Sequence, residues 1–383
     1  MNCTICFWRK RALGLFAFRS QIGLRFLVLV LAATLRCAAG SLTNYAGTGE
    51  AGWSGDGGPA LQAKLDNPFG IVRGPDGALW FADYASNLIR RIAADGTIET
   101  VIGDGTAAYA GDGGAAREAS LNHPHELRFD RAGNLFIADT SNHAIRRYNA
   151  NTKTLSTFAG TGKPGYSGDG GKAVKAALNL PISLQFSPAG DLYIADIGNH
   201  VIRRVNGKTG EITTFAGTGK AGATPDGSPI VGTPLNGPRS LDFDAAGNLW
   251  LVTREGNQVL RFDLNKGVIH CVAGPGQKGF TSNAGLAKDA TLSGPKGIAV
   301  AGDGGVYLAD TENHAIRRIN TNRGTLELVA GTGEKGDGSA GDPLDTRLSR
   351  PHGIFVDDDG SVFIGDSENH RIRVIRSSKT PAQ

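Results

Sequence analysis

Cysteine is scarce in this sequence of 383 residues, and its placement limits how the chain can be stabilised. Three of the four cysteines, Cys3, Cys6 and Cys37, lie within the first forty residues. If that segment is removed, Cys271 alone remains and no internal disulfide can form. Cys271 lies in the apolar run VIHCVAG, where it is expected to act as a small buried hydrophobic residue. A chain with a large core does not need disulfides, even outside the cell.

Acidic side chains are absent from the first forty residues, which contain six basic ones: Arg9, Lys10, Arg11, Arg19, Arg25 and Arg36. The whole chain has 40 basic and 36 acidic side chains, so without these six the basic residues number 34. The basic balance therefore comes from the N-terminal segment. It gives no argument for a nucleic-acid partner, and none is expected.

Long apolar runs are also lacking. The run from Phe26 to Leu35 has ten residues, whereas a bilayer requires about 20. A basic stretch precedes this run and small residues follow it, which predicts a signal peptide over 1–40 and a secreted or periplasmic protein with no stable membrane span after cleavage. Two alternatives are an uncleaved anchor, which Arg19 and Arg25 interrupt, and a lipoprotein signal at Cys37, which Arg36 disfavours.

Glycine, in contrast, is abundant, and its 56 residues without a Gly-X-Y period indicate many tight turns. The chain is also repetitive, because the stretch ADTSNHAIRR at 138–147 returns in five other places. The spacing between copies is 56 or 57 residues, measured at the aspartate position: Asp83, Asp139, Asp196, Thr253, Asp310 and Asp366. The sequence therefore predicts six copies of one structural unit.

One copy of this repeat carries Asp139, Ser141 and His143, which together resemble the residues of a hydrolase. The serine is not kept in the other copies, which hold Ala85, Gly198, Glu255, Glu312 and Glu368. A nucleophile cannot be glycine in one copy and glutamate in the next. We therefore interpret the repeated turn as architecture, and expect packing or hydrogen-bonding roles for its histidines: His143, His200, His314 and His370.

Each unit contains four short apolar runs separated by turn sequences, which predicts an all-β, six-bladed β-propeller of four-stranded antiparallel blades. The sixth unit lacks a fourth strand, so the mature N-terminal segment SLTNYAGTG, from Ser41, is expected to pair with 371–375 and close the ring. The propeller is expected to span 41–376, with a disordered tail over 377–383. In each third strand, one arginine is expected to face solvent and the other to pair with acids of a neighbouring blade.

These repeats resemble a known family. The pattern D-x-x-N-H-x-I-R on strand–turn–strand units is similar to NHL repeats, and six units resemble the six-bladed NHL propellers. The connector sequence AGTG, then SGDGG, then a proline resembles the NHL variety of teneurins and many exported bacterial proteins. The resemblance covers 41–376 and implies the fold, whereas such propellers have binding, signalling and enzymatic roles.

The connectors between units contain a recurring aromatic residue, then an acid or amide, then a short helix. The aromatic positions are Trp53, Tyr109, Tyr166 and Phe280, and the acid or amide positions are Asp56, Asp112, Asp169, Asp226 and Asn283. In a structural interpretation, the aspartate caps the helix and the aromatic residue fixes the loop to the blade. Calcium binding is the alternative, but each loop offers few oxygen ligands.

Function is expected where the copies differ, in the residues that follow each unit's proline and surround the channel mouth. The candidate ligand-binding residues there are His125, Glu126, Arg128, Arg239, Lys296 and His352. Gln185 and Asp242 are expected to lie one turn deeper. The cations and histidines suit an anionic ligand, such as a carboxylate, a sugar acid or a peptide terminus.

Metal binding is the main alternative at this mouth. His125 and His352 occupy matching positions and His123 is close by, as in a related amidating-lyase propeller that carries a metal on channel histidines. The third alternate blade offers Arg239, which cannot be a ligand, so no zinc, calcium or other cofactor is expected. We therefore favour a monomeric, non-catalytic module that binds a protein, peptide or small anion. A metal-dependent lyase or lactonase is the alternative.

Overall fold

The computed structural model describes residues 40–281 and 285–377. Apart from Gly40 and Ser377, the predicted signal peptide and tail lie outside the described residues, as does Asn283. The described residues form six antiparallel sheets of four or five strands, and their helices are single turns of 3₁₀ type. The predicted all-β, six-bladed propeller is therefore confirmed.

Each sheet is one blade. Blade 1 contains β2 (Pro68–Arg73), β3 (Leu79–Asp83), β4 (Leu88–Ile92) and β5 (Ile98–Ile102). Blade 2 contains β6 (Pro124–Phe129), β7 (Leu135–Asp139), β8 (Ala144–Asn149) and β9 (Thr154–Ala159). Blade 3 contains β11 (Pro181–Phe186), β12 (Leu192–Asp196), β13 (Val201–Val205) and β14 (Glu211–Gly217), with the short β10 (Gly171–Lys172) at its outer edge.

The other three blades follow the same order. Blade 4 contains β16 (Pro238–Phe243), β17 (Leu249–Thr253), β18 (Gln258–Asp263) and β19 (Val268–Ala273), edged by β15 (Ser228–Pro229). Blade 5 contains β21 (Gly297–Val300), β22 (Val306–Asp310), β23 (Ala315–Asn320) and β24 (Thr325–Ala330), edged by β20 (Gly285–Leu286). Blade 6 contains β25 (Ile354–Val356), β26 (Val362–Asp366), β27 (Arg371–Ile375) and β1 (Leu42–Ala46).

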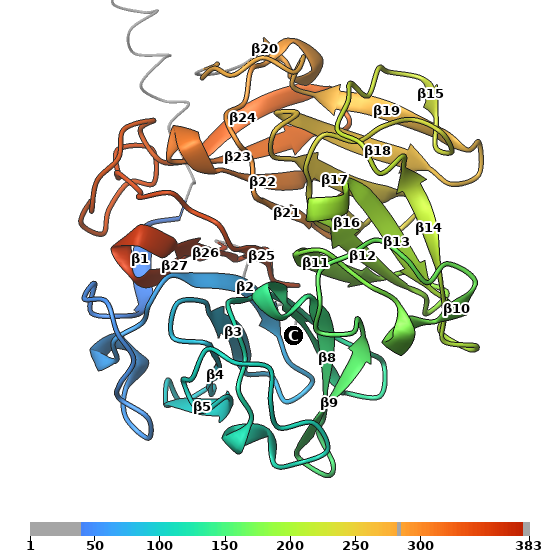
Figure 1. Ribbon diagram of the computed structural model, residues 1–383. Coiled ribbons are helices and arrows are strands. Elements are labelled where there is room, and N and C mark those ends of the chain that lie inside the picture. The colour runs from blue at the N-terminus through green and yellow to red at the C-terminus, as the bar shows by residue number, and fades with distance from the viewer. Residues whose placement is uncertain (1–39, 282–284, 378–383) are drawn as a thin grey trace, which may run out of the picture. The chain divides into compact units, whose positions relative to one another are not determined.

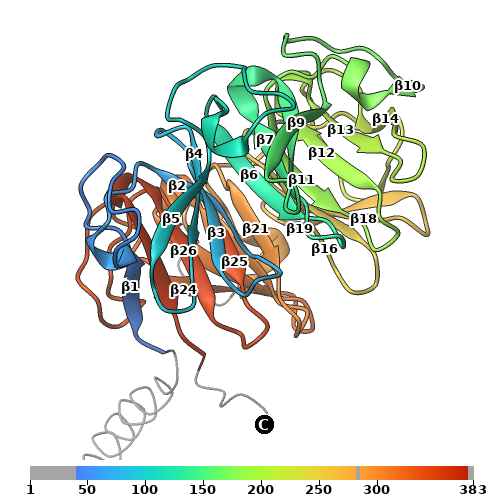
Figure 2. The ribbon, with the colours of Figure 1, turned by 90° about the horizontal axis from the view of Figure 1, so that it is seen from below.

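The ring closes through the strand from the beginning of the propeller. The innermost strands contact one another in the order β2, β6, β11, β16, β21, β25 and back to β2. Figure 1 looks along the centre of this ring, and Figure 2 shows the sheets from a view turned by 90°. The outermost strand of blade 6 is β1, which pairs antiparallel with β27 so that Leu42 faces Ile375. This confirms the predicted closure.

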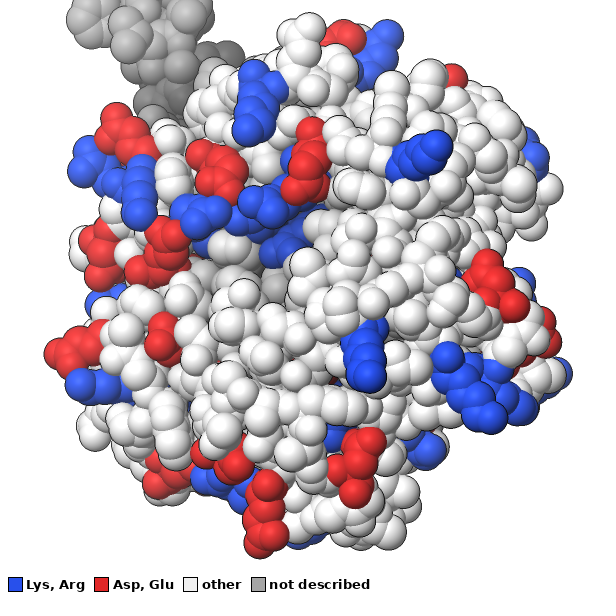
Figure 3. Space-filling model, in the orientation of Figure 1, with Lys and Arg blue, Asp and Glu red and all other residues white. Residues whose placement is uncertain are grey.

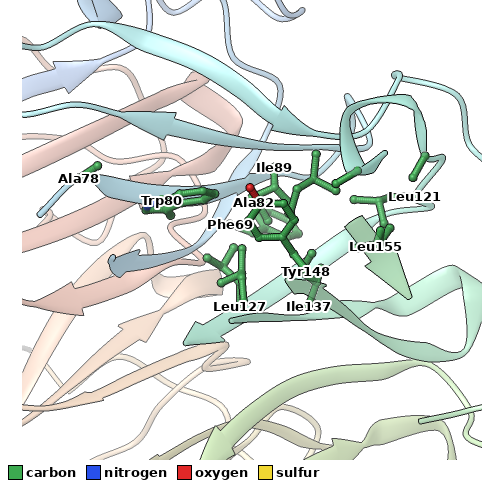
Figure 4. Packing of buried hydrophobic residues seen from close by; sticks show 14 residues of the cluster. Phe69, Ala78, Trp80, Ala82, Ile89, Leu121, Leu127, Ile137, Tyr148 and Leu155 are labelled. Atoms are coloured by element: carbon green, nitrogen blue, oxygen red, sulfur yellow. The ribbon is translucent and has the colours of Figure 1, made fainter. Parts of the chain in front are cut away.

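The core is divided among six clusters, and each lies between two adjacent blades. The inner strands are covered by a blade on either side, so their apolar side chains are buried on both faces. Figure 4 shows the cluster where blades 1 and 2 meet, which includes Phe69, Trp80, Ile89, Leu127, Ile137 and Tyr148. Each blade therefore depends on its neighbours for burial.

One arginine of the third strand, at the position equivalent to Arg146, is fully buried in five blades: Arg90, Arg146, Arg203, Arg317 and Arg373. Each lies 2.7–3.7 Å from the aspartate of its own blade's turn. In four blades it also pairs, at 2.5–2.8 Å, with an aspartate of the preceding connector: Asp56, Asp112, Asp169 or Asp337. The expected pairing with acids of a neighbouring blade is therefore wrong. The carboxylates come from the turn of the same blade and from the connector before it, and they compensate the charge of the buried guanidinium.

The connectors contain the short helices η1 (Ala60–Gln62), η2 (Ala116–Glu118), η4 (Ala173–Lys175) and η6 (Ala287–Asp289). The predicted aspartate cap is wrong, since none of these four helices has a side-chain capping bond. In the connectors of η1, η2 and η4 the aspartate pairs with the buried arginine instead. The aromatic ring covers the same guanidinium, at 5.0 Å for Tyr109 and 5.3 Å for Tyr166, which fixes the loop as expected.

The repeated turn joins each blade to the next. In four blades it contains a short helix: η3 (Thr140–Asn142), η5 (Ile197–Asn199), η7 (Thr311–Asn313) and η8 (Ser367–Asn369). In all six blades the turn includes a residue of positive φ: Asn87, His143, His200, Asn257, His314 and His370. Its Nδ1 or Oδ1 atom accepts a backbone N–H bond of 2.8–3.4 Å from the start of the next blade. The histidines thus have the structural role predicted for them.

Replacing His143 and His314 with asparagine should reduce the loss of stability in acid. Burial lowers the pKa of both histidines, from an ordinary value of about 6.5. Their stabilising contribution is therefore full above the unfolded pKa and is lost as the pH falls, because protonation removes the Nδ1 acceptor. Asparagine accepts the same bond at every pH, as Asn87 and Asn257 do here.

Urea unfolding at pH 7.5 and pH 5.0 tests this expectation. The double variant should lie within about 1 kcal/mol of the parent at pH 7.5, because the hydrogen bonds are preserved. It should then lose less stability than the parent on acidification. Equal losses in the two proteins would show that the turn histidines do not titrate with unfolding.

Candidate functional site

Six side chains, one from each blade, surround the mouth of the central channel. They follow the prolines that precede or begin the inner strands: Phe69, His125, Ile182, Arg239, Lys296 and His352. Each is only 5–8% exposed. The structure therefore brings together four of the predicted site residues, His125, Arg239, Lys296 and His352, at equivalent positions of a closed ring.

Phe69 fills one side of this ring. Its centroid lies 4.2 Å from that of His352, with the two rings stacked, and 4.6 Å from that of His125. Tyr84 covers Phe69 at a centroid distance of 4.3 Å. The two histidines are therefore held apart by an aromatic side chain, and their other edges face the cations of blades 4 and 5.

Each of these cations donates to a histidine. The Nη2 atom of Arg239 donates to Nε2 of His125 at 2.6 Å. The ammonium of Lys296 lies 3.2 Å from Nε2 of His352 and 3.0 Å from a carboxylate oxygen of Glu312. Because Nδ1 of His352 donates to the carbonyl of Arg350, at 2.8 Å, its Nε2 is the acceptor for Lys296.

Glu312 and Arg350 belong to the same group, although the sequence interpretation did not include them. The guanidinium of Arg350 donates to both carboxylate oxygens of Glu312, at 2.7 and 3.1 Å, and to Glu368 at 2.8 Å. The available signal was the repeated turn, which has glutamate at the serine position in the last three blades: Glu255, Glu312 and Glu368. Two of these side chains bind Arg350 at the mouth.

The electrostatics of the mouth follow from burial beside like charges. Burial and the nearby Arg254 lower the pKa of Arg239 to about 9, and burial together with Arg239 lowers the pKa of Lys296 to about 8. Burial and the same two cations hold the pKa of His125 and His352 well below the usual range, so both imidazoles are neutral near pH 7. Two buried cations therefore remain charged at this site.

Glu312 compensates the charge of Lys296. Burial acts to raise the pKa of Glu312, but hydrogen bonds from Arg350 and Lys296 lower it to about 2. Arg239 differs, because among the described residues no carboxylate oxygen lies within 4.0 Å of its guanidinium, and its buried Nε atom has no hydrogen-bond partner. In direct contact Arg239 therefore has a neutral partner only, and the charges of Glu126 and Glu255 act on it from farther away.

The remaining predicted residues lie elsewhere in the channel. Glu126 and Arg128 pair with each other at 2.6 Å, which leaves neither carboxylate nor guanidinium unpaired. Gln185 donates to Asp242 at 2.8 Å, and the second oxygen of Asp242 accepts from the backbone of Val300. The two contacts of Asp242 connect the inner strands of neighbouring blades.

The residues of the mouth do not fit a metal ion. Arg239 and Lys296 lie against the Nε2 atoms of His125 and His352, and Nδ1 of His123 bonds to Ser141 at 3.1 Å. Within 40–281 and 285–377, no three His, Cys, Asp or Glu side chains are grouped as metal ligands. The mouth therefore presents two cations, Arg239 and Lys296, beside two neutral imidazoles. Figure 3 shows Lys and Arg side chains gathered beside the hollow in the middle of one face.

Comparison with known proteins agrees with the repeats. A family model described as NHL repeat matches residues 292–319 and 348–375, which lie in blades 5 and 6. The same turn recurs in the other blades, and the sheets form the expected ring. The chain is an NHL-repeat β-propeller.

Curated proteins similar to this NHL propeller are much longer than it is. The chain is 27% identical over 359 residues to mouse (Mus musculus) teneurin-1, covering 84% of the chain and 13% of the teneurin. It is 30% identical over 282 residues to the Arabidopsis thaliana protein SUPPRESSOR OF QUENCHING 1, chloroplastic, covering 70% of the chain and 26% of that protein. The NHL propeller thus spans about an eighth to a quarter of these relatives.

Solved structures resemble the NHL propeller in fold at low sequence identity. An auxiliary nutrient binding protein from Bacteroides thetaiotaomicron has a TM-score of 0.66 and 17% identity, covering 88% of this chain and 76% of that one. Virginiamycin B lyase from Staphylococcus aureus has a TM-score of 0.51 and 16% identity, covering 82% and 97%. Across the part of the chain that the structure describes, no helix is long and apolar enough to cross a membrane.

Proposed function

We propose that the NHL propeller is a secreted or periplasmic binding module whose channel mouth takes the carboxylate of a small acid or a peptide terminus. The observation that carries this proposal is Arg239, a buried guanidinium whose hydrogen-bond partner is the neutral His125. A buried charge without a counter-charge is costly, and an anion bound there relieves that cost. The name of the Bacteroides neighbour, auxiliary nutrient binding protein, is compatible with such a role.

Lys296 adds the second cation that a carboxylate needs. It is shared between Glu312 and His352, and burial together with the nearby Arg239 lowers its pKa. An anion placed between Arg239 and Lys296 would interact with both charges through charge-assisted hydrogen bonds. The neutral histidines can complete the site without repelling the ligand.

Binding of succinate, D-glucuronate and a peptide with a free C-terminal carboxylate, measured by calorimetry on the full chain, tests this function. At least one of these probes should bind, and Arg239→Gln and Lys296→Gln should each weaken its binding at least tenfold. Arg91→Gln is the matched control, because Arg91 pairs with Asp76 and Glu99 away from the mouth. Unchanged affinity in both mouth variants would rule out the site.

The affinity should also depend on pH. The pKa of Lys296 is about 8, so Lys296 loses its charge as the pH rises through that value. Binding of a carboxylate should therefore weaken between pH 7 and pH 9, and Lys296→Gln should remove much of this dependence. The same pH dependence in the parent and the variant would assign the effect to another group.

A further inference from the structure

Blade 4 differs from the other blades at the outer end of its connector. In the other blades a planar side chain lies against a glycine of the following AGTG-type segment. A Cβ at that glycine would lie 2.6–3.5 Å from the ring in four cases, the pairs being Gly105 with Trp53, Gly162 with Tyr109, Gly219 with Tyr166 and Gly333 with Phe280. In blade 6 a Cβ at Gly49 would lie 2.3 Å from the guanidinium of Arg371.

The corresponding glycine of blade 4 is Gly276, and no ring covers it. A Cβ there would meet only the carbonyl oxygen of Gly256, at 3.7 Å, among the described residues. The reason is in the sequence, because the aromatic position of this connector holds Ala223. Three neighbours changed with it: Thr253, Gly256 and Leu260 replace the aspartate, asparagine and buried arginine of the repeat.

A pocket of about 480 Å³ results at this place. We call it the blade-4 pocket, and its lining includes Ala223, Asn236, Glu255, Gly256, Gln258 and Gly276. The pocket therefore coincides with the position that a ring occupies in the sister blades. Its volume is within the range of small-ligand sites and exceeds that of one ring, so the backbone flanking a side chain can also enter.

The polar groups of the blade-4 pocket suit a ring that carries a hydrogen-bond donor. Glu255 is 43% exposed at its side chain, and Asn236 and Gln258 also line the wall. The hydroxyl of Tyr166 bonds to Thr214 in blade 3, where blade 4 has Cys271. A phenol or indole entering from outside can instead donate to Glu255 or to an amide oxygen.

We propose that the blade-4 pocket binds a tyrosine or tryptophan side chain presented by a partner protein. The sister blades show that this position accepts an aromatic ring, and the pocket provides acceptors for its O–H or N–H group. The pocket adjoins the channel mouth, because Asn236 in its lining lies three residues before Arg239. Burial lowers the pKa of Arg239, and the charge of Glu255, also in the lining, opposes that change. A polypeptide bound at this face can therefore reach the pocket. The proposal does not depend on an anion at the mouth.

Titration of the full chain with N-acetyl-L-tyrosinamide and N-acetyl-L-tryptophanamide, followed by ligand-observed NMR, tests the blade-4 pocket. At least one aromatic amide should bind at least tenfold more tightly than N-acetyl-L-leucinamide. Ala223→Tyr fills the pocket from within, as Tyr166 does in blade 3, and should weaken that binding at least tenfold. Ala223→Ser is the matched control and should bind as the parent does.

A second variant keeps the test valid if Ala223→Tyr does not fold. Gln258→Arg places at this position the residue that blade 6 has there, since Arg371 covers Gly49. It should also weaken aromatic binding, whereas Arg239→Gln should leave it unchanged, which separates this site from the mouth. Equal binding of the leucine probe, or parental binding by both folded filling variants, would overturn the proposal.

Discussion

Deleting residues 41–48 should abolish cooperative folding of the propeller. These residues include β1, the outer strand of blade 6, which pairs with β27 from the other end of the propeller. Without β1, the edge of β27 is unpaired and the core cluster between blades 5 and 6 loses Leu42. Circular dichroism and urea unfolding should show a protein with no native transition. A deletion variant with the parental unfolding midpoint would contradict the role of β1 in closure.

A point variant separates the packing of β1 from its chain connectivity. Leu42 is fully buried, so Leu42→Ala should lower the free energy of unfolding by about 2–5 kcal/mol, the cost of a cavity in a packed core. Thr43 lies next to it on the same strand but is only partly buried. Thr43→Ala should change stability by less than about 1 kcal/mol and serves as the control.

Replacing Arg146 with leucine should lower the free energy of unfolding by about 3–5 kcal/mol, because it leaves a buried carboxylate without its counter-charge. Arg146 is fully buried and lies 3.0 Å from Asp139 and 2.7 Å from Asp112. Burial raises the pKa of Asp139 to about 6, although Asn142, the backbone of Asn122 and Arg146 act to lower it. Removing Arg146 takes away part of that opposing stabilisation. Urea unfolding at pH 7.5 provides the measurement.

Blade 4 provides the matched control for this substitution. At the two equivalent positions it has Leu260 and Thr253, both fully buried, and its strands β16–β19 pair in the same order as β6–β9 of blade 2. The double variant Arg146→Leu with Asp139→Thr should therefore recover at least half of the loss caused by Arg146→Leu alone. A double variant that is less stable than the single one would show that the ion pair is not the source of the effect.

The repeated architecture could be predicted because each copy has the same turn residues and the same apolar runs. Turn residues such as Asn87 and His143 tolerate positive φ, and the apolar runs between the turns have the length of strands. The same reasoning failed for Arg146, because arginine usually remains at the surface. Its burial depends on Asp112, which comes from a connector 34 residues earlier in the chain. Such a contact exists only after the connector folds back over the blade.

The channel mouth was predicted in part. The position after each proline identified Arg239, Lys296 and the two histidines, since inner strands begin at equivalent places in every blade. Which of these charges have a partner could not be predicted from the sequence. Glu126 is paired with Arg128 two residues away, whereas Lys296 reaches Glu312 in the turn of its own blade. Those choices depend on side-chain packing around the ring.

The sequence by itself determined the number of blades, the strands within them and the closing strand, because these follow from a local pattern repeated at a constant spacing. The tertiary structure alone decided which charged groups are buried together and which remain without a counter-charge. It also decided that the loss of one ring at Ala223 leaves a pocket, because only folding brings that connector against Gly276. Repetition fixes local geometry, whereas recognition depends on contacts between segments that are far apart in the chain.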